Sequence, residues 1–200
     1  MTTPELIRIA PMVFIHPPHC IPKGTPDGAI LLSQYPSDVF GDGSHPTTRL
    51  SSRAVDYCCR VQKPQSFLDI GTGTGILARL ARAHGVPFVA ATDIDPIALQ
   101  EARQNALLDH APVPISFSNA APDSWGARFD LVVANILEGV LRDIAPALIS
   151  ALVPSGTLMI SGFTPLQAPF LKVFFSNRGV RYEQEARLDE WALLRFRRVS

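Results

Sequence analysis

The sequence predicts an α/β fold in which helices cover both faces of a mainly parallel sheet. Strand and helix patterns alternate from Ser66 to Gly179, which is typical of proteins with a parallel sheet. The segments 180–188 and 191–199 both have strand character with no helix between them, so the final strand should run antiparallel. Residues 1–46 contain eight of the 18 prolines, which disfavours long helices there. We therefore expect a short proline-rich β extension or lid at 1–46, followed by one domain at 47–200.

The individual elements follow from changes in the hydrophobic period along the chain. Thr47 or Thr48 should cap a first helix at 47–61. Asp95 followed by Pro96 begins another helix, and Pro146 should kink or split the helical segment 138–153. The face of the first helix that should point inward comprises Leu50, Ala54, Tyr57, Cys58 and Val61. The other expected helices are 75–85, 95–110 and 165–179, and the other expected strands are 12–15, 29–32, 66–70, 87–93, 114–118, 129–135 and 157–163. We expect the first two strands to form a small hairpin or edge ribbon.

Composition limits the class of protein. Hydrophobic residues make up 46% of the chain and charged residues 18%, which indicates a real core and argues against disorder. Lys plus Arg and Asp plus Glu number 18 each, so no overall field attracts nucleic acid. The three cysteines have no disulfide spacing, and the N-terminus does not resemble a signal peptide. With no apolar run of about 18 residues, we expect a cytoplasmic protein with no membrane segment.

A glycine-rich turn follows the expected strand at 66–70. Gly71, Gly73 and Gly75 let the backbone approach a ligand closely, and Asp93 ends the next strand, where a carboxylate can bind both hydroxyls of a ribose. The dinucleotide fingerprint G-x-G-x-x-G is broken by Ile76, which disfavours a pyrophosphate cofactor. A nucleoside without phosphates, such as S-adenosyl-L-methionine, fits this turn, and a tight bend without a ligand is the alternative.

Four segments in this order and spacing resemble the PrmA family, the bacterial methyltransferases of ribosomal protein L11. They are "FGDGSHPTT" at 40–48, "LDIGTGTGILA" at 68–78, "TDIDPIALQEARQNA" at 92–106 and "DLVVANILEGVL" at 130–141. The resemblance implies a Rossmann-like, seven-stranded class I methyltransferase sheet that uses S-adenosyl-L-methionine to modify protein amines. The sequence departs from the family pattern at Asp42, where a small residue is usual. It also departs in residues 1–40, which are too few for the family's N-terminal substrate domain.

Candidate site residues come from the resemblance and from their positions at strand ends. The resemblance implies cofactor contacts at Thr48, Gly71, Asp93 and Asn135. The full set of expected cofactor-binding residues is Thr48, Asp69, Gly71, Gly73, Gly75, Asp93, Ile94, Asn119 and Asn135. Asn135 is the expected catalytic residue, its side-chain oxygen accepting a hydrogen bond from the target N–H. His45 is a second catalytic candidate that would help deprotonate the amine, the alternative being a loop histidine bonded to backbone.

Weaker candidates surround this set. Asn119 or Asp123 could recognise adenine, and Glu138 could attract an ammonium group, although a solvated carboxylate at a helix start is the simpler interpretation. The segment "HPPHC" at 16–20 holds three possible metal ligands, but no second cluster completes a site, so no metal is expected.

The sequence therefore predicts a methyltransferase whose acceptor is a protein amine, either a lysine or an N-terminal amine, with a ribosomal protein as the candidate partner. One alternative is a methyltransferase of a small molecule or RNA. Another is a pseudoenzyme that binds the cofactor without catalysis. A dinucleotide-dependent oxidoreductase comes last because of Ile76.

Overall fold

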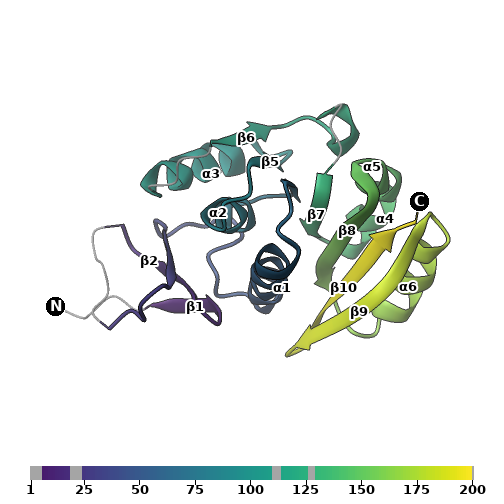
Figure 1. Cartoon of the computed structure of the whole chain (residues 1–200), viewed down its shortest axis with the longest axis horizontal. Helices are drawn as coiled ribbons and strands as arrows, with labels where there is room; N and C mark the ends of the chain where they lie inside the picture. Colours follow the sequence, from purple (N-terminus) through teal and green to yellow (C-terminus); the bar gives the residue numbers. More distant parts are fainter. Residues whose placement is uncertain (1–5, 19–23, 110–113, 126–128, 200) are drawn as a thin grey trace.

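The computed structural model describes residues 6–18, 24–109, 114–125 and 129–199. Their strands form two sheets, a three-stranded sheet near the N-terminus and a seven-stranded sheet that runs through the middle of the molecule (Figure 1). Figure 1 shows α1 and α2 on one side of the large sheet and α4, α5 and α6 on the other. The α/β class predicted from the alternating pattern is confirmed.

The large sheet has the strand order β6-β5-β4-β7-β8-β10-β9. Strands β4 to β8 are mutually parallel, and β10 runs antiparallel to both of its neighbours, β8 and β9, as predicted. The order reverses between β4 and β7, which is where open α/β sheets bind ligands. The strands are β4 (Ser66–Ile70), β5 (Phe88–Thr92), β6 (Ile115–Ser118), β7 (Phe129–Asn135), β8 (Leu152–Phe163), β9 (Val180–Leu188) and β10 (Trp191–Arg198).

Two hydrophobic cores cover the two faces of this sheet. Successive strand residues point to opposite faces, so Leu131 and Val133 join the core under α1 and α2, whereas Val132 and Ala134 join the core under α4 to α6. The helices are α1 (Pro46–Gln62), α2 (Ile76–Ala83), α3 (Pro96–Leu108), α4 (Glu138–Asp143), α5 (Ala145–Ser150) and α6 (Ala168–Ser176), with a short 3-10 helix η1 (Pro122–Trp125). Pro146 lies in the first turn of α5, so the predicted split of segment 138–153 is confirmed.

The small sheet differs from the expected hairpin of segments 12–15 and 29–32. Strands β2 (Val13–His16) and β3 (Ile30–Ser33) pair in parallel, and the antiparallel partner of β2 is β1 (Ile7–Ala10), which the sequence analysis did not predict. The tight turn after Ala10 pairs β1 with β2, and the longer connection after His16 brings the chain back in the same direction. The sheet packs on α1, because Ile9, Val13 and Leu32 belong to the same core.

Helix α1 departs from its expected cap and its expected inward face. His45 caps the helix through its side chain, and Thr47 and Thr48 lie buried inside the first turn. Tyr57 and Val61 are 50% and 61% exposed, so their predicted inward orientation is wrong. The buried side is instead broad, because α1 contacts α2 and β1 as well as β8 and β10. Cys58 and the adjacent Cys59 are consequently both buried.

Among the described residues, no helix has the length and apolar character needed to cross a membrane.

Candidate active site

The glycine turn connects β4 to α2 at the carboxyl edge of the sheet. Gly71, Gly73 and Gly75 have φ angles of 67°, 53° and 83°, a region that L side chains rarely adopt. A Cβ at Gly71 would lie 2.3 Å from a methyl group of Ile136, and one at Gly73 would lie 2.2 Å from the carbonyl oxygen of Phe40. Backbone conformation and neighbouring protein atoms thus both require glycine here, and the expected ligand approach stays a prediction.

The segment 40–48 lies directly against this turn. The Thr74 backbone N–H donates to the carbonyl of Phe40 at 3.0 Å, and the Thr74 hydroxyl donates to the carbonyl of Gly41 at 2.7 Å. The side chain of Gln34 donates to the same Gly41 carbonyl at 3.4 Å. The fold thereby joins two motifs that are about 30 residues apart in the sequence, and it holds the segment that precedes α1 against the turn that follows β4.

Asp93 follows β5 and holds the glycine turn. Its Oδ2 accepts a hydrogen bond from the Gly73 N–H at 2.9 Å, and its Oδ1 accepts from the Asp95 N–H at 3.0 Å. Each carboxylate oxygen has further lone pairs, and the side chain is only partly buried. The adjacent Ile94 is 94% exposed, and Asn119, at the end of the neighbouring strand β6, is exposed too. These three positions therefore share one edge of the sheet.

Asp69 lies inside the turn rather than at its surface. It is 1% exposed, and its Oδ2 accepts hydrogen bonds from the Thr72 hydroxyl at 2.7 Å and from the Ala78 N–H at 3.2 Å. Burial raises the pKa of Asp69 to about 7, although these two hydrogen bonds oppose the shift and nearby Asp93 adds to it. Asp69 therefore anchors the turn to the first residues of α2.

Thr48 and Asn135 each present a buried oxygen that lacks a protein donor or acceptor among the described residues. The atoms are the hydroxyl oxygen of Thr48 and the Oδ1 of Asn135. Asn135 ends β7, next to Ile136, which packs against Gly71. By strand alternation its side chain points to the same face as Val133, which is the face that α1 covers. A buried polar atom without a partner is costly, so these oxygens are candidates for bonding to a ligand.

The hydroxyl of Ser51 has the same property and was missed by the sequence analysis. It lies fully buried one turn after Thr48 on α1 and lacks a partner among the described residues. The helical spacing i, i+3 from Thr48 was the available signal.

His45 is held by capping and by ring contacts. Its Nδ1 accepts a hydrogen bond from the Thr47 N–H at 3.3 Å and lies 2.8 Å from the Thr47 hydroxyl. Because a backbone N–H can only donate, Nδ1 is an acceptor, and the proton of the neutral ring is on Nε2. The ring centroid lies 5.2 Å from that of Phe40 and 4.9 Å from that of Trp191. Neither aromatic neighbour was predicted as a site residue.

Several weaker candidates have other partners. Glu138 forms an ion pair with Arg142 at 2.8 Å, and the carboxylate of Asp42 accepts from the N–H and hydroxyl of Ser44 at 2.9 and 2.7 Å. Asp123 is exposed on η1.

Of the segment "HPPHC", the structure describes His16, Pro17 and Pro18. His16 donates through Nδ1 to the Pro17 carbonyl at 2.8 Å, and its Nε2 lies 3.0 Å from the Ser33 hydroxyl. His19 and Cys20 lie outside the described residues. Over the described ranges, no group of three His, Cys, Asp or Glu side chains could hold a metal ion.

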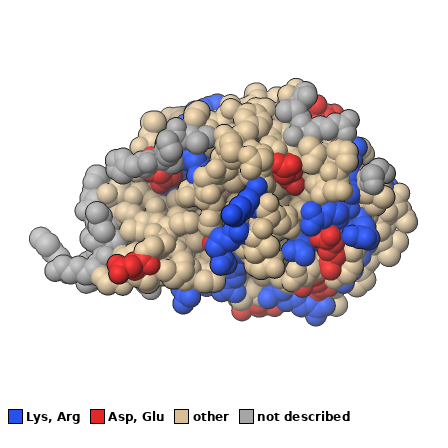
Figure 2. All heavy atoms as spheres, viewed as in Figure 1, with Lys and Arg blue, Asp and Glu red and all other residues tan. Residues whose placement is uncertain are grey.

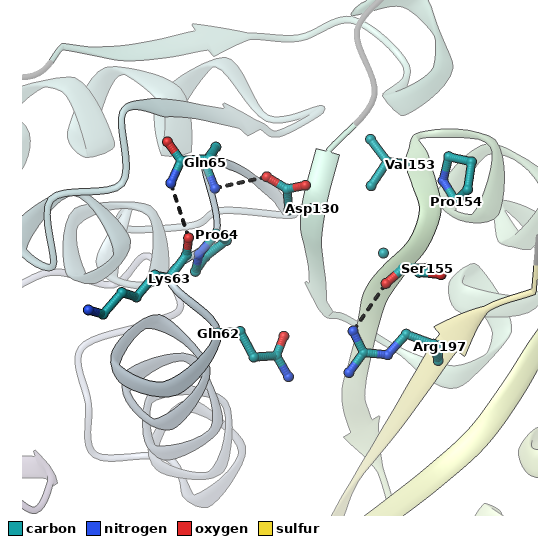
Figure 3. A pocket seen from close by; sticks show the side chains of 10 residues that line it. Gln62, Lys63, Pro64, Gln65, Asp130, Val153, Pro154, Ser155 and Arg197 are labelled. Carbon is teal, nitrogen blue, oxygen red and sulfur yellow. Dashed lines mark hydrogen bonds between the residues drawn. The ribbon is translucent and has the colours of Figure 1, made fainter.

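Two hollows lie at the opposite edge of the large sheet. One, of about 290 Å³, is lined by side chains at the amino ends of β4 and β7 and at the start of β8, including Gln65, Asp130 and Ser155 (Figure 3). In it the Gln65 N–H donates to Asp130 at 2.8 Å, and Arg197 donates to the carbonyl of Ser155 at 3.1 Å. The second, of about 360 Å³, is formed by the same 63–65 loop and by His84 with its neighbours. Neither contains a residue of the glycine turn.

On the face drawn in Figure 2, basic and acidic side chains are both present, and toward the right the two signs lie beside each other. Glu183 pairs with Arg181, Arg195 and Arg197 on the last two strands.

Comparison with known proteins agrees with this arrangement. The profile of the family "Ribosomal protein L11 methyltransferase (PrmA)" matches residues 5–199, nearly the whole chain. The chain belongs to the PrmA family. The resemblance seen in the four sequence motifs is thus confirmed, and so is the methyltransferase fold that it implied.

Individual members of the PrmA family and related folds support the assignment. The ribosomal protein L11 methyltransferase of Burkholderia vietnamiensis (strain G4 / LMG 22486) is 45% identical over 141 residues, which is 70% of this chain and 45% of that protein. The crystal structure of ribosomal protein L11 methylase from Lactobacillus delbrueckii subsp. bulgaricus matches with a TM-score of 0.87 and 27% identity, covering 98% of this chain and 100% of that one.

A more distant structure is the N-methyltransferase NodS from Bradyrhizobium japonicum WM9 in complex with S-adenosyl-L-homocysteine. It has a TM-score of 0.60 and 15% identity, covers 78% of this chain and 90% of its own, and shares the fold. This PrmA-family chain spans about half the length of the curated relatives that it matches.

Proposed function

We propose that this chain is an S-adenosyl-L-methionine-dependent N-methyltransferase that transfers a methyl group to a protein amine, with a ribosomal protein as the leading acceptor. The observation that carries the proposal is the buried Oδ1 of Asn135, which has no hydrogen-bond partner among the described residues and lies at the end of β7, beside the glycine turn. The relatives named as ribosomal protein L11 methyltransferases support the acceptor class, and the S-adenosyl-L-homocysteine complex of a protein with the same fold supports the cofactor.

The residues at the carboxyl edge fit this cofactor. Asp93 would accept the ribose hydroxyls with the lone pairs that its bonds to Gly73 and Asp95 leave free. The exposed Ile94 would pack against the adenine ring, with Asn119 in reach of its polar edge. Thr48 would satisfy its buried hydroxyl on the amino-acid end. When bound, the cofactor supplies an electrophilic methyl group on a positively charged sulfur.

Asn135 would orient the acceptor amine. Its Oδ1 accepts a hydrogen bond from the target N–H and aims the nitrogen lone pair at the methyl group, so that most of the rate enhancement comes from alignment. A neutral amine needs no strong base. In this proposal His45 orients the loop and presents Nε2–H as a donor, because its Nδ1 is occupied by the N–H of Thr47.

Two measurements test the cofactor and the acceptor separately. Calorimetry should detect binding of S-adenosyl-L-methionine and S-adenosyl-L-homocysteine but not of NAD, and the reverse preference would refute the cofactor. A lysate of the host incubated with the chain and methyl-labelled cofactor should acquire label that protease removes and ribonuclease leaves. Label sensitive only to ribonuclease, or no label despite cofactor binding, would refute the protein-amine acceptor.

The role of Asn135 has its own test. Asn135→Ala should lower kcat with saturating cofactor by about 100-fold or more, as expected for a group that positions a reactant. Asn177→Ala, at the exposed C-cap of α6, is the matched control and should leave turnover unchanged. Full turnover of Asn135→Ala would exclude this role.

A further inference from the structure

Three aromatic rings from distant parts of the sequence form a row at the carboxyl edge of the sheet. His45 is the middle ring, tilted by 59° to Phe40 and by 63° to Trp191. Phe40 is 49% exposed, and His45 and Trp191 are partly buried. A half-exposed ring in contact with other rings offers a surface on which another group can bind.

Each ring is mounted on rigid backbone. The carbonyl of Phe40 accepts a hydrogen bond from the Thr74 N–H in the glycine turn. His45 caps α1 with its side chain, and its carbonyl accepts from the Thr48 N–H at 3.1 Å. Trp191 begins β10 and is paired with Leu188 on β9. The row is therefore formed before any ligand arrives, which reduces the entropic cost of binding.

The row lies on the same side of the sheet as the Asn135 side chain. Asn135 and Leu193 are both opposite Ser161 on β8, so the three residues form one line across neighbouring strands. Trp191 points to the same face as Leu193, two residues nearer the carboxyl edge of β8. Because adjacent strands are about 4.8 Å apart, the strand of Trp191 is about 10 Å from that of Asn135.

The surroundings of Trp191 favour a cation. Asp189 and Glu190 form the turn that precedes it, and both are exposed. Carboxylates at the mouth of a site attract an ammonium group and raise its local concentration.

We propose that Phe40, His45 and Trp191 form an aromatic wall that binds the cationic, methylated end of the acceptor amine through its ring faces. This inference rests on the proposed function and specifies its substrate: an alkyl amine that is neutral when it attacks and carries positive charge after transfer. In the transfer, the amine nitrogen forms the new N–C bond as the S–C bond breaks, the S–C electron pair stays on sulfur, and the positive charge moves to nitrogen. An N–H methylammonium product then releases its proton to water before a further transfer.

Ring faces suit this change of charge. A fully methylated ammonium has no N–H to donate, so the hydrogen bond to Asn135 is no longer available to it. Aromatic faces attract the cation regardless of its N–H groups. The wall therefore stabilises the charge that develops on nitrogen and holds partly methylated amines in place.

The test uses a quaternary ammonium and its neutral isostere. Choline and 3,3-dimethylbutan-1-ol have nearly the same shape and differ in charge. Each is titrated into the ¹⁵N-labelled full chain, and the indole N–H signal of Trp191 is followed, with Trp125→Phe used to assign it. Choline should bind about two- to fivefold more tightly than the alcohol, the range expected for a partly exposed cation–π contact. Equal affinity for the two probes, or no shift of the Trp191 signal, overturns the proposal.

Variants separate the wall from general effects on folding. Phe40→Leu and Trp191→Leu should each abolish the preference for choline, followed through the methyl signals of the probes, and Trp191→Phe should retain it. Phe170→Leu is the control, since it removes a 53% exposed ring from α6, on the other side of the sheet. A preference for choline that survives Trp191→Leu refutes the wall.

S-adenosyl-L-homocysteine affinity is measured on every variant. If neither the wild type nor any variant bound S-adenosyl-L-homocysteine, the proposed function would be refuted. The choline titrations would still test separately whether the aromatic wall binds a cation.

Discussion

Asp109, at the C-cap of α3, neutralises two buried arginines, and its replacement by alanine should destabilise the protein severely. The carboxylate accepts from Nε and a terminal nitrogen of Arg79 at 2.8 Å each, and from Arg82 at 2.8 Å. The exposed fractions of the three side chains are 0% for Arg79, 5% for Arg82 and 9% for Asp109. Arg79 also donates to the carbonyl of Ser33, the last residue of β3, so this cluster joins the small sheet to α2 and α3.

The magnitude follows from the burial. Burial already lowers the pKa of Arg82, and Asp109 counteracts this effect. Asp109→Ala would leave two neighbouring guanidinium groups without their counter-ion. Breaking a buried pair in this way costs about 3–5 kcal/mol, a large share of the roughly 5–15 kcal/mol that stabilises a domain. With a urea m-value of about 2 kcal/mol per M, a loss of 4 kcal/mol moves the unfolding midpoint by about 2 M.

Urea denaturation followed by circular dichroism measures this loss. Glu138→Ala is the control because its partner Arg142 is 44% exposed, and such pairs contribute about 1 kcal/mol or less. A double-mutant cycle with Arg79→Ala isolates the coupling between Arg79 and Asp109. If Asp109→Ala cost less than about 1 kcal/mol, or no more than the control, the argument from burial would be refuted.

Three further predictions concern the candidate site. The raised pKa of Asp69, about 7 against an ordinary 3.8, means that its contribution to stability is complete below about pH 4 and is lost as the pH rises to 7. In urea titrations the free energy of unfolding of Asp69→Asn should therefore rise relative to that of the wild type by about 1.4 kcal/mol per pH unit across that window. A difference in unfolding free energy that does not change with pH would contradict the shifted pKa. Thr48→Val should change the free energy of unfolding by no more than about 1 kcal/mol, because the buried hydroxyl of Thr48 has no partner among the described residues. The same variant should lower the affinity for S-adenosyl-L-homocysteine about tenfold in calorimetry. Unchanged affinity would show that Thr48 does not contact the cofactor. Gly71→Ala should lower the free energy of unfolding by about 1–3 kcal/mol in thermal or urea unfolding, since φ is 67° and the new Cβ meets Ile136. Gly85→Ala is the comparison variant, and a Gly71→Ala protein that is as stable as the wild type would contradict the close packing.

Much of the fold could be predicted because its signals are local. The cap at Asp95, the split at Pro146 and the last two strands depend on residues within a few positions of each other. Strand β1 was missed because four residues with an exposed Arg8 give too short a pattern. Tyr57 and Val61 were predicted to point inward, and the reason for the error is that α1 has neighbours on several sides, which its own periodicity does not reveal.

The candidate site divides in the same way. The glycines, Asp93 and Asn135 could be selected because residues at the carboxyl ends of successive strands share one edge. The pKa of Asp69 and the tautomer of His45 could not, since they depend on the burial of one side chain and on the bond that Thr47 donates to the other.

The amino-acid sequence by itself determined the alternation of strands and helices, the antiparallel last strand and the family, because hydrophobic spacing and short motifs are properties of neighbouring residues. Only the tertiary structure decided that Phe40 lies against the glycine turn, that Asp109 neutralises Arg79, and that Trp191 meets His45. Those contacts join residues 30 to about 146 positions apart. They exist because the order of the sheet strands brings the segments together, and no local pattern encodes which distant partner fills a given space.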